Sequence, residues 1–411
     1  MEHFLCCEGK YEDESYIWFS AYTHNGIYRI NKRTQKVKLI GRIPGEKGYK
    51  ARQYKVVISL NDWMIFVPLS AKEIAILNCK NNKIKKISLK KIPDKRKRQY
   101  IEDCKFWTGI AYKNYVYLFG LSYPAIIRLE PDTEEMEYYV EWIDKIEKKI
   151  ENIKEIYFFV EGIIRGNDVY LPFCCTNAVL IFNLENKTTK IVEINSKVKG
   201  FCGIVDDGEN LWLAPEKNQD QNIIKWNPDS GEIKVIPVSY TNPKAKIASL
   251  LIIENIIYLF SNKTEDVYVI DCKTEIVKKH ERLSNMLHVE KKRYVLDYEL
   301  VLALGYHIDG FTYINGRDYS WHTYNYKTDS ETILYYKADE EECRNIEWLY
   351  KISCDGILIE DDFFSFPLFL KYLNQEKESK EIFESRSRIG TLICKKMSIK
   401  KTGEKKSNEM E

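Results

Sequence analysis

Aromatic, cationic and amide side chains that could bind a polar ligand or a peptide gather in short polar segments along the whole chain. Such segments include "AYTHNG", "PFCCTNA" and "INGRDYSWH". Tyr, Trp and Arg are enriched at interface hot spots, and a few placed polar groups orient small ligands in pockets. The candidate binding residues are Tyr22, His24, Lys72, Tyr123, Asn177, Lys217, Asn262 and Arg317 in these segments, and Arg52, Arg98 and Trp107 in the longer connections.

Acidic residues offer a second kind of chemistry. Two carboxylates held about 5–10 Å apart in one pocket could act on a carbohydrate. Glu161 and Asp206 are the groups on which such an enzyme would depend. However, Asp206 and Asp207 precede Gly208 in "IVDDGEN", an order typical of a hairpin turn. We therefore expect these two aspartates to shape a turn.

Signatures of known catalytic and metal centres are missing from the sequence. It contains no Gly-rich phosphate loop, no His-Glu-x-x-His, no Gly-x-Ser-x-Gly and no Cys-x-x-Cys. The six histidines include no ligand-spaced pair, and the eleven cysteines are scattered, with two adjacent pairs that could not chelate one metal ion. We expect reduced, buried thiols, no metal and no cofactor.

A repeated strand-and-turn pattern provides the framework for these residues. An apolar strand ends on an anchor residue, which is Asn or Asp in six copies and Glu in one. The anchors are Asn31, Asn78, Glu130, Asn183, Asn227, Asp271 and Asn325. Successive anchors are 47, 52, 53, 44, 44 and 54 residues apart, a spacing typical of propeller blades.

The positions around each anchor show how the strand is buried. The residues one and four before the anchor are large and apolar in every copy, and alternation places them on opposite faces, so we expect both faces to be covered. An apolar residue follows six after the anchor in five copies and eight after it in copies four and seven, as Ile191 and Ile333. This difference predicts a two-residue insertion there. In "NPDSGE", Gly231 would supply the left-handed position of the turn.

An aromatic strand and a further strand precede each anchored strand, and one more follows it, as in "YVYLFG" and "TGIAYKN". Four antiparallel strands repeated seven times predict an all-β fold, a seven-bladed β-propeller. The "WNPDSGEIKVI" turn resembles those of the Kelch-like and quinoprotein-like propeller superfamilies. The resemblance implies the fold, and it carries no catalytic residue or cofactor to this chain, since Kelch double glycines and Trp-Asp pairs are missing.

Two segments depart from the repeat. We expect the propeller to span residues 1–345, with a helix inserted at about 141–156 that either packs on the propeller or docks a partner. Residues 346–394, rich in phenylalanine, should form a strand and helix that pack on the rim, close the ring or bind a partner. Residues 395–411 are rich in Lys, Glu and Ser and are expected to be disordered.

Charge and hydropathy restrict the partners. The 63 Lys and Arg nearly balance the 61 Asp and Glu, so nucleic acid is an unlikely partner, and the basic run at 90–100 is expected to be a solvated loop. The sequence has no secretion signal and no apolar stretch long enough to cross a membrane, which favours a cytoplasmic protein. We therefore expect a non-enzymatic propeller that binds or scaffolds proteins through its loop face. The alternative is an enzyme or sensor for a carbohydrate or other polar small molecule over the central channel.

Overall fold

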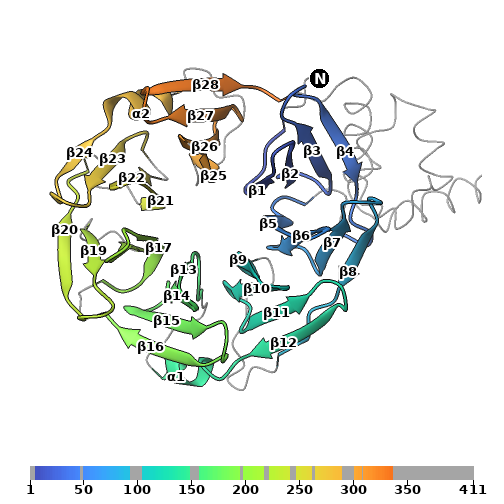
Figure 1. Cartoon of the computed structure of the whole chain (residues 1–411), viewed down its shortest axis with the longest axis horizontal. Helices are drawn as coiled ribbons and strands as arrows, with labels where there is room; N and C mark the ends of the chain where they lie inside the picture. The colour runs from blue at the N-terminus through green and yellow to red at the C-terminus, as the bar shows by residue number, and fades with distance from the viewer. Residues whose placement is uncertain are drawn as a thin grey trace, which may run out of the picture.

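The computed structural model describes residues 5–46, 50–92, 104–148, 157–194, 198–216, 222–240, 247–261, 264–288, 300–307 and 309–336. Within them, 28 strands form seven four-stranded antiparallel sheets. The sheets stand around a central axis as the blades of a propeller (Figure 1). The seven-bladed β-propeller predicted from the repeats is therefore confirmed.

The first three blades contain strands β1 to β12. Their bounds are β1 (Lys10–Glu12), β2 (Tyr16–Ser20), β3 (Ile27–Asn31), β4 (Val37–Gly41), β5 (Tyr54–Leu60), β6 (Trp63–Pro68), β7 (Ile74–Asn78), β8 (Ile84–Ile87), β9 (Phe106–Tyr112), β10 (Tyr115–Gly120), β11 (Ile126–Glu130) and β12 (Glu135–Tyr139).

The other four blades contain strands β13 to β28. Their bounds are β13 (Ile163–Arg165), β14 (Asp168–Pro172), β15 (Ala178–Asn183), β16 (Thr189–Glu193), β17 (Phe201–Asp206), β18 (Leu211–Pro215), β19 (Asn222–Trp226), β20 (Ile233–Pro237), β21 (Ile247–Ile253), β22 (Ile256–Ser261), β23 (Val267–Asp271), β24 (Val277–Lys279), β25 (Val301–His307), β26 (Gly310–Asn315), β27 (Trp321–Asn325) and β28 (Ser330–Leu334).

Within each blade the strands lie side by side in chain order. The first strand of every blade, namely β1, β5, β9, β13, β17, β21 or β25, lies nearest the axis, and the fourth lies at the rim (Figure 1). This arrangement brings seven segments that are far apart in the sequence around one channel.

The third strand of each blade is buried as its apolar pattern predicts. All residues one and four before an anchor are at most 6% exposed, from Ile27 and Ile30 in β3 to Trp321 and Tyr324 in β27. The hydrophobic core consists of successive clusters between neighbouring blades, because each blade of the ring has a neighbouring blade against each of its two faces.

The two-residue insertion expected in copies four and seven is wrong. In both blades the residue six after the anchor faces the residue just before it, as Thr189 faces Phe182 and Glu331 faces Tyr324. The hairpins therefore have the usual length, and Ile191 and Ile333 lie two residues further along the outer strand. Ile333 is 50% exposed, so this position is not a core position in blade seven.

The hairpins between third and fourth strands share one turn geometry. In the six Asn and Asp copies, the anchor Oδ1 accepts the backbone N–H groups two and three residues later, as Asn31 accepts from Arg33 and Thr34. The fourth residue after every anchor has a positive φ, including Gly231 at 76°. At Glu130, the Thr133 hydroxyl donates to the anchor carboxylate instead.

Among the described residues, the first and last blades exchange no strand. Leu5 N–H donates to Tyr336 O at 3.3 Å, and Ala303 N–H donates to Glu8 O at 3.0 Å. The Trp321 indole N–H donates to Leu5 O at 2.9 Å, and its ring contacts Tyr336. A short N-terminal segment is thus held against blade seven.

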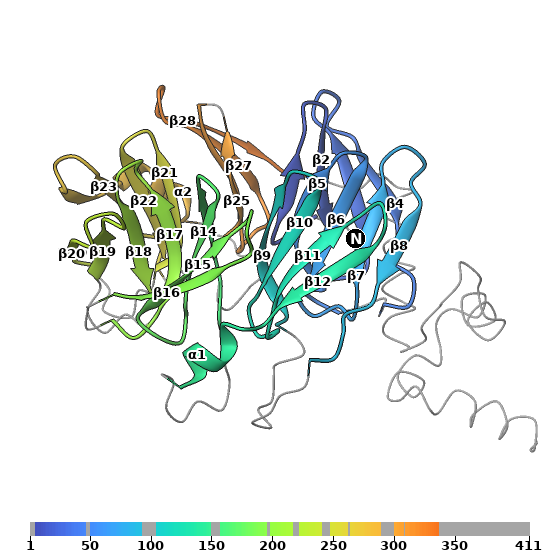
Figure 2. The same cartoon turned by 60° about the horizontal axis from the view of Figure 1, so that its bottom comes forward.

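Two short helices accompany the strands within the described ranges. Helix α1 (Ile143–Glu147) lies in the predicted insert (Figure 2). Its neighbour Trp142 is fully buried against Phe158 and Phe159. Residues 149–156 of the insert lie outside the described residues, as do the 346–394 extension and the 395–411 tail. Helix α2 (Glu281–Met286) was not expected from the sequence. It begins at His280, whose Nδ1 accepts from Leu283 N–H.

Candidate functional site in the central channel

Most of the predicted loop residues have structural roles. Tyr22 and His24 are at most 6% exposed, and the His24 Nε2 pairs with the Tyr28 hydroxyl at 2.8 Å. Tyr123 donates its hydroxyl to Lys90 O, and Asn177 donates its amide to Ile194 O. These groups join neighbouring strands and loops of the propeller rather than form one site.

The remaining loop residues are distributed around the ring. Arg317 pairs with Glu265, and Lys72 is exposed, with its backbone N–H donating to Glu46. Arg98, Lys217 and Asn262 lie outside the described residues, as does most of the basic run at 90–100. Among the predicted residues that the structure describes, Arg52 and Trp107 lie together, and Trp107 lines the central channel.

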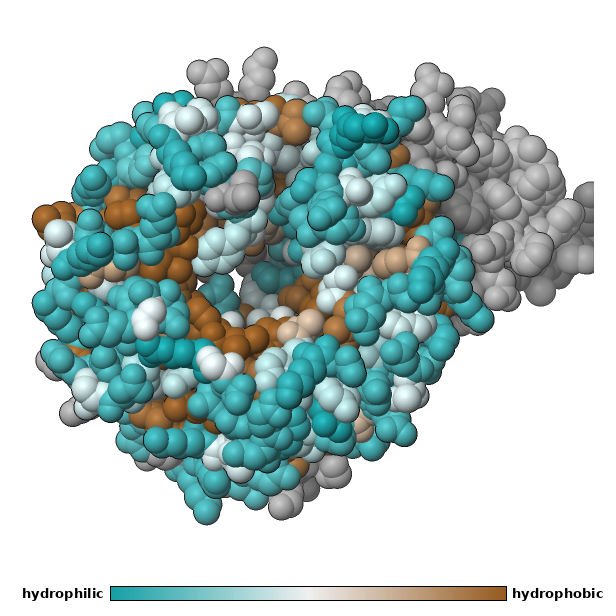
Figure 3. All heavy atoms as spheres, viewed as in Figure 1, coloured by the Kyte–Doolittle hydropathy of each residue, from teal (hydrophilic) through white to brown (hydrophobic). Residues whose placement is uncertain are grey.

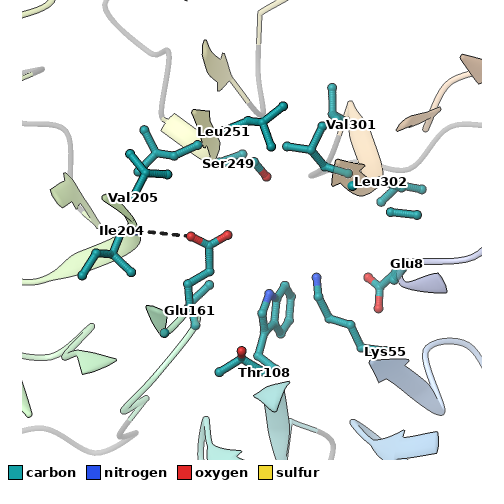
Figure 4. Close-up of a pocket in the computed structure, with 18 of the residues that line it drawn as sticks. Glu8, Lys55, Thr108, Glu161, Ile204, Val205, Ser249, Leu251, Val301 and Leu302 are labelled. Atoms are coloured by element: carbon teal, nitrogen blue, oxygen red, sulfur yellow. Dashed lines mark hydrogen bonds between the residues drawn. The ribbon is translucent and has the colours of Figure 1, made fainter. Parts of the chain in front are cut away.

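The channel is a cavity of about 400 Å³ lined by residues in or next to the innermost strand of every blade. Figure 4 shows Glu8, Lys55, Thr108 and Glu161 directed into it. A volume of this size lies in the range of about 300–1,000 Å³ typical of small-ligand pockets.

The cation Lys55 and the aromatic ring of Trp107 line one part of the wall, and Arg52 lies beside this ring. The Lys55 Nζ lies 3.5 Å from the centroid of a Trp107 ring, and the Arg52 guanidinium carbon lies 5.1 Å from it. The Arg52 Nε also lies 2.7 Å from Glu8 Oε1. Lys55, by contrast, forms no ion pair with a carboxylate among the described residues, and its ammonium lies over the Trp107 ring at the channel.

The strand that carries Lys55 is positioned by close backbone packing. A Cβ atom on Gly9 would stand 1.8 Å from the Lys55 carbonyl oxygen, so only glycine fits beside this strand. Gly9 follows Glu8 directly in the chain. The first and second blades therefore approach closely where the charged groups enter the channel.

Glu161 provides the negative charge on the other side of Lys55 and Trp107. Its Oε2 accepts the Ile204 N–H at 3.2 Å (Figure 4). A Cβ on Gly203 would stand 3.2 Å from this oxygen and 2.8 Å from Leu250 Cδ1, so glycine makes room for both groups. Burial raises the pKa of the Glu161 carboxyl from 4.5 to about 7, against the opposing effects of that N–H and of Lys55.

The rest of the wall is lined mainly by residues of apolar types, which come from the inner strands of blades five to seven. These residues include Ile204, Val205, Leu250, Leu251, Val301, Leu302 and Leu304. Most of their side chains also pack in the clusters between blades. Figure 3 shows apolar side chains around part of the channel mouth. Ser249 and Tyr306 add hydroxyl groups to this arc.

A triad-like arrangement in blade seven lies away from the channel. The Ser320 Oγ is 2.7 Å from His322 Nε2, and His322 Nδ1 is 2.5 Å from Glu331 Oε1. Ser320 is 1% exposed and also donates to Asp318, so a substrate could not reach its oxygen. We interpret this network as a structural brace between β27 and β28.

The expected turn at Asp206 and Asp207 is confirmed. The Asp206 Oδ1 accepts Gly208 N–H, and Asp207 accepts the N–H groups of Glu209 and Asn210. Gly208 has a φ of 96°. Asp206 is not part of the channel lining, so Glu161 and Glu8 are the two carboxylates that share that cavity.

No cluster of side chains in the described part of the chain has the composition of a metal site. The eight described cysteines carry thiols rather than disulfides, and burial raises the pKa of the Cys7 and Cys174 thiols. No helix among the described residues is long and apolar enough to cross a bilayer.

The sequence drew attention to Trp107, Arg52 and Glu161 but not to Lys55 or Glu8. Lys55 precedes "VVISL", and Glu8 lies two residues before β1. An available signal was their position at the start of innermost strands, because residues there face the axis of a propeller. The channel-facing residues include charged and aromatic ones in blades one to four and are mainly of apolar types in blades five to seven. This difference could be recognised only after the blades had been aligned.

No family model and no curated protein matches this sequence. Solved structures do match in fold. A virginiamycin B lyase from Staphylococcus aureus gives a TM-score of 0.52 at 15% identity, covering 77% of this chain and 96% of that one. A streptogramin B lyase gives 0.52 at 13% identity, covering 77% and 94%. YCF48 bound to D1 peptide gives 0.51 at 8% identity, covering 77% and 92%.

Identities this low show the propeller fold alone. Membership of the Kelch-like or quinoprotein-like groups in particular stays a prediction.

Proposed function

We propose that this propeller is a protein-binding platform whose central channel takes up a short segment of the partner. The observation that carries the proposal is the channel itself, which is lined from all seven blades. It has an ammonium, a carboxylate and an aromatic ring on one side and residues of mainly apolar types on the other. This moves the expected contact from the loop face to the channel. A cytoplasmic location fits the sequence and stays a prediction.

The rim gives less support for a platform of its own. Among the described residues, its exposed apolar side chains are few, and Val235, Ile276 and Ile333 belong to three different blades. Isolated exposed apolar residues are normal on protein surfaces and do not form an interface patch.

Blocking the channel tests the proposal. A random peptide library is displayed against the full-length protein, and the enriched peptides are synthesised and their affinities measured. Ser249→Trp should weaken their binding at least about tenfold, because a bulky side chain would fill the cavity. Ser330→Trp makes the same substitution at an exposed position of β28 and should leave the affinity unchanged. The proposal would be contradicted if no peptide were enriched, or if Ser249→Trp left the affinity of the enriched peptides unchanged.

The alternative is an enzyme or sensor for a polar small molecule, and Glu161 favours it. A carboxyl group with a pKa of about 7 is suited to general acid–base chemistry at neutral pH, and Glu8 provides a second carboxylate in the same cavity. However, Arg52 already engages Glu8. The two functions differ in the peptide screen, since a small-molecule site would not enrich peptides that compete for the channel.

A further inference from the structure

The channel wall is divided by blade into a charged arc and an apolar arc. The charged arc comes from blades one to four and contains Glu8, Lys55, Trp107 and Glu161. The apolar arc comes from blades five to seven. Figure 4 shows the two arcs facing each other across the cavity. An occupant that matches both must have charged groups on one side and an apolar group on the other.

Lys55 and the ionised form of Glu161 have opposite charges and face the same space without forming an ion pair with each other in the part of the chain described. Each therefore retains hydrogen-bonding capacity. The Lys55 ammonium has three donors, and the Glu161 carboxylate uses one of its acceptor sites on Ile204 N–H. A ligand that places a cation on Glu161 and a neighbouring oxygen on Lys55 would satisfy both.

The boundary between the arcs runs beside Glu161. An atom at the Gly203 Cβ position would contact both the Glu161 carboxylate and the Leu250 side chain, so these two groups are immediate neighbours. A ligand whose cation binds Glu161 could therefore reach the apolar arc with a group attached only a few covalent bonds from that cation. The α-ammonium group of an apolar amino-terminal residue has this arrangement, with its side chain and its carbonyl oxygen both attached to the next carbon.

We propose that the segment taken up by the channel is a free protein amino terminus with an apolar first residue; this rests on the proposed function. Its ammonium donates to Glu161, its first carbonyl oxygen accepts from Lys55, and its side chain lies against Leu250 and Leu251. Trp107 covers the backbone that follows. A backbone threaded in this way leaves through the channel mouth to the rest of the partner.

Other segments fit less well. A carboxyl terminus would place its charge in the cavity that holds the carboxylates of Glu161 and Glu8, which is repulsive. The ammonium of an internal lysine carries no oxygen next to it for Lys55. A phosphorylated residue could pair with Lys55 but would leave Glu161 opposite a like charge.

Amino-terminal acetylation tests this inference on the unaltered protein. Leucyl-alanyl-alaninamide is titrated into the full-length chain at up to millimolar concentration and compared with its acetylated form, using calorimetry. Acetylation should weaken binding about tenfold or more, because it removes a charge-assisted hydrogen bond. Replacing the first residue by aspartate should weaken binding to a similar degree.

Variants assign the effect to the named groups. Glu161→Gln should remove the preference for the free amine, and Lys55→Met should weaken binding of both peptides. Glu232→Gln changes the same kind of group at an exposed turn in blade five and should behave as the wild type. Circular dichroism establishes that each variant is folded.

The outcomes separate the two proposals. If enriched library peptides bind in the channel but acetylated and free peptides bind equally, the inference about the amino terminus is wrong and the proposed function stands. If free leucine binds and no peptide does, both are wrong and the small-molecule alternative is supported. The inference is also overturned if Glu161→Gln leaves the affinity for the peptide with a free amino terminus unchanged.

Discussion

At the scale of single residues, environment sets the behaviour of chemically identical groups. Glu12 and Glu161 are both desolvated glutamates. Glu12 pairs with Lys10 and Lys32, and these partners outweigh burial and lower its pKa. Glu161 has one N–H donor and the attraction of Lys55, so burial prevails and raises its pKa to about 7. The lack of a direct cationic partner is what makes Glu161 a candidate binding group.

This shift predicts a pH dependence of stability. In the unfolded state Glu161 releases its proton near pH 4.5, whereas the folded state holds this proton up to about pH 7. The contribution of Glu161 to the unfolding free energy is therefore greatest below pH 4.5 and is lost as pH rises through about 7. Lys55 and Tyr306 are titratable groups that interact electrostatically with Glu161. Between about pH 5 and about pH 8, the unfolding free energy of the wild type relative to Glu161→Gln should therefore fall by roughly 1–3 kcal/mol.

Urea denaturation of both proteins across this range measures the effect. Taking the difference between the two removes the contribution of all other titrating groups. Glu232→Gln, at an exposed site, should show no such slope. A difference that is independent of pH would contradict the assigned shift.

At the scale of elements, one turn recurs seven times with little help from glycine. The fourth residue after the anchor has a positive φ in every blade, yet only Gly231 is a glycine, and the others include Gln35 and Lys187. Left-handed backbone costs about 1–2 kcal/mol for residues with a Cβ. In six blades the anchor's hydrogen bonds to the two preceding N–H groups hold the turn and offset this cost.

Gly231→Ala should therefore destabilise the protein by about 1 kcal/mol without changing the fold, because it adds that conformational cost at a φ of 76°. Gln35→Gly at the equivalent exposed position of blade one should have the opposite sign or no effect. Thermal or urea denaturation of the two variants provides the measurement. Equal destabilisation by both would show that the turns are not equivalent.

At the scale of the whole molecule, stability depends on how the ring is closed. In the part of the chain that the structure describes, residues 5–8 hydrogen-bond to blade seven and hold it against blade one. Trp321 is central to this contact through its hydrogen bond to Leu5 O and its rings against Phe19 and Tyr336. Lys10 adds a hydrogen bond to the Thr312 hydroxyl at 2.6 Å.

Trp321→Ala should lower the unfolding free energy by about 3–5 kcal/mol, because it leaves a cavity at the junction of the first and last blades. Trp321→Phe keeps most of the packing and removes the N–H donor, so its loss should be smaller, at about 1–2 kcal/mol. Hydrogen exchange should show faster opening of β1 and β2 in the alanine variant. Uniform loss of protection across all blades would indicate that the ring unfolds as one unit instead.

The strand pattern was readable from the sequence because it depends on local periodicity. The buried columns before each anchor, the aromatic second strands and the turn at Gly231 all follow from alternation and turn chemistry. The insertion inferred at Ile191 and Ile333 was wrong, because the outer strand of a blade is partly exposed and does not need an apolar residue at one fixed position. The position of such a residue therefore does not indicate how the outer strand pairs with the third strand. Helix α2 was missed because its single short turn lacks an apolar period.

The sequence by itself determined that seven similar four-strand units follow one another, since hydrophobic alternation and the anchor turns act over a few residues. Only the tertiary structure decided which side chains meet, because Glu8, Lys55, Trp107 and Glu161 come from four blades and approach one another only when the ring closes. It also placed Tyr22 and His24 in the core and raised the pKa of Glu161. Burial and charge proximity are properties of the folded ring, and no local pattern encodes them.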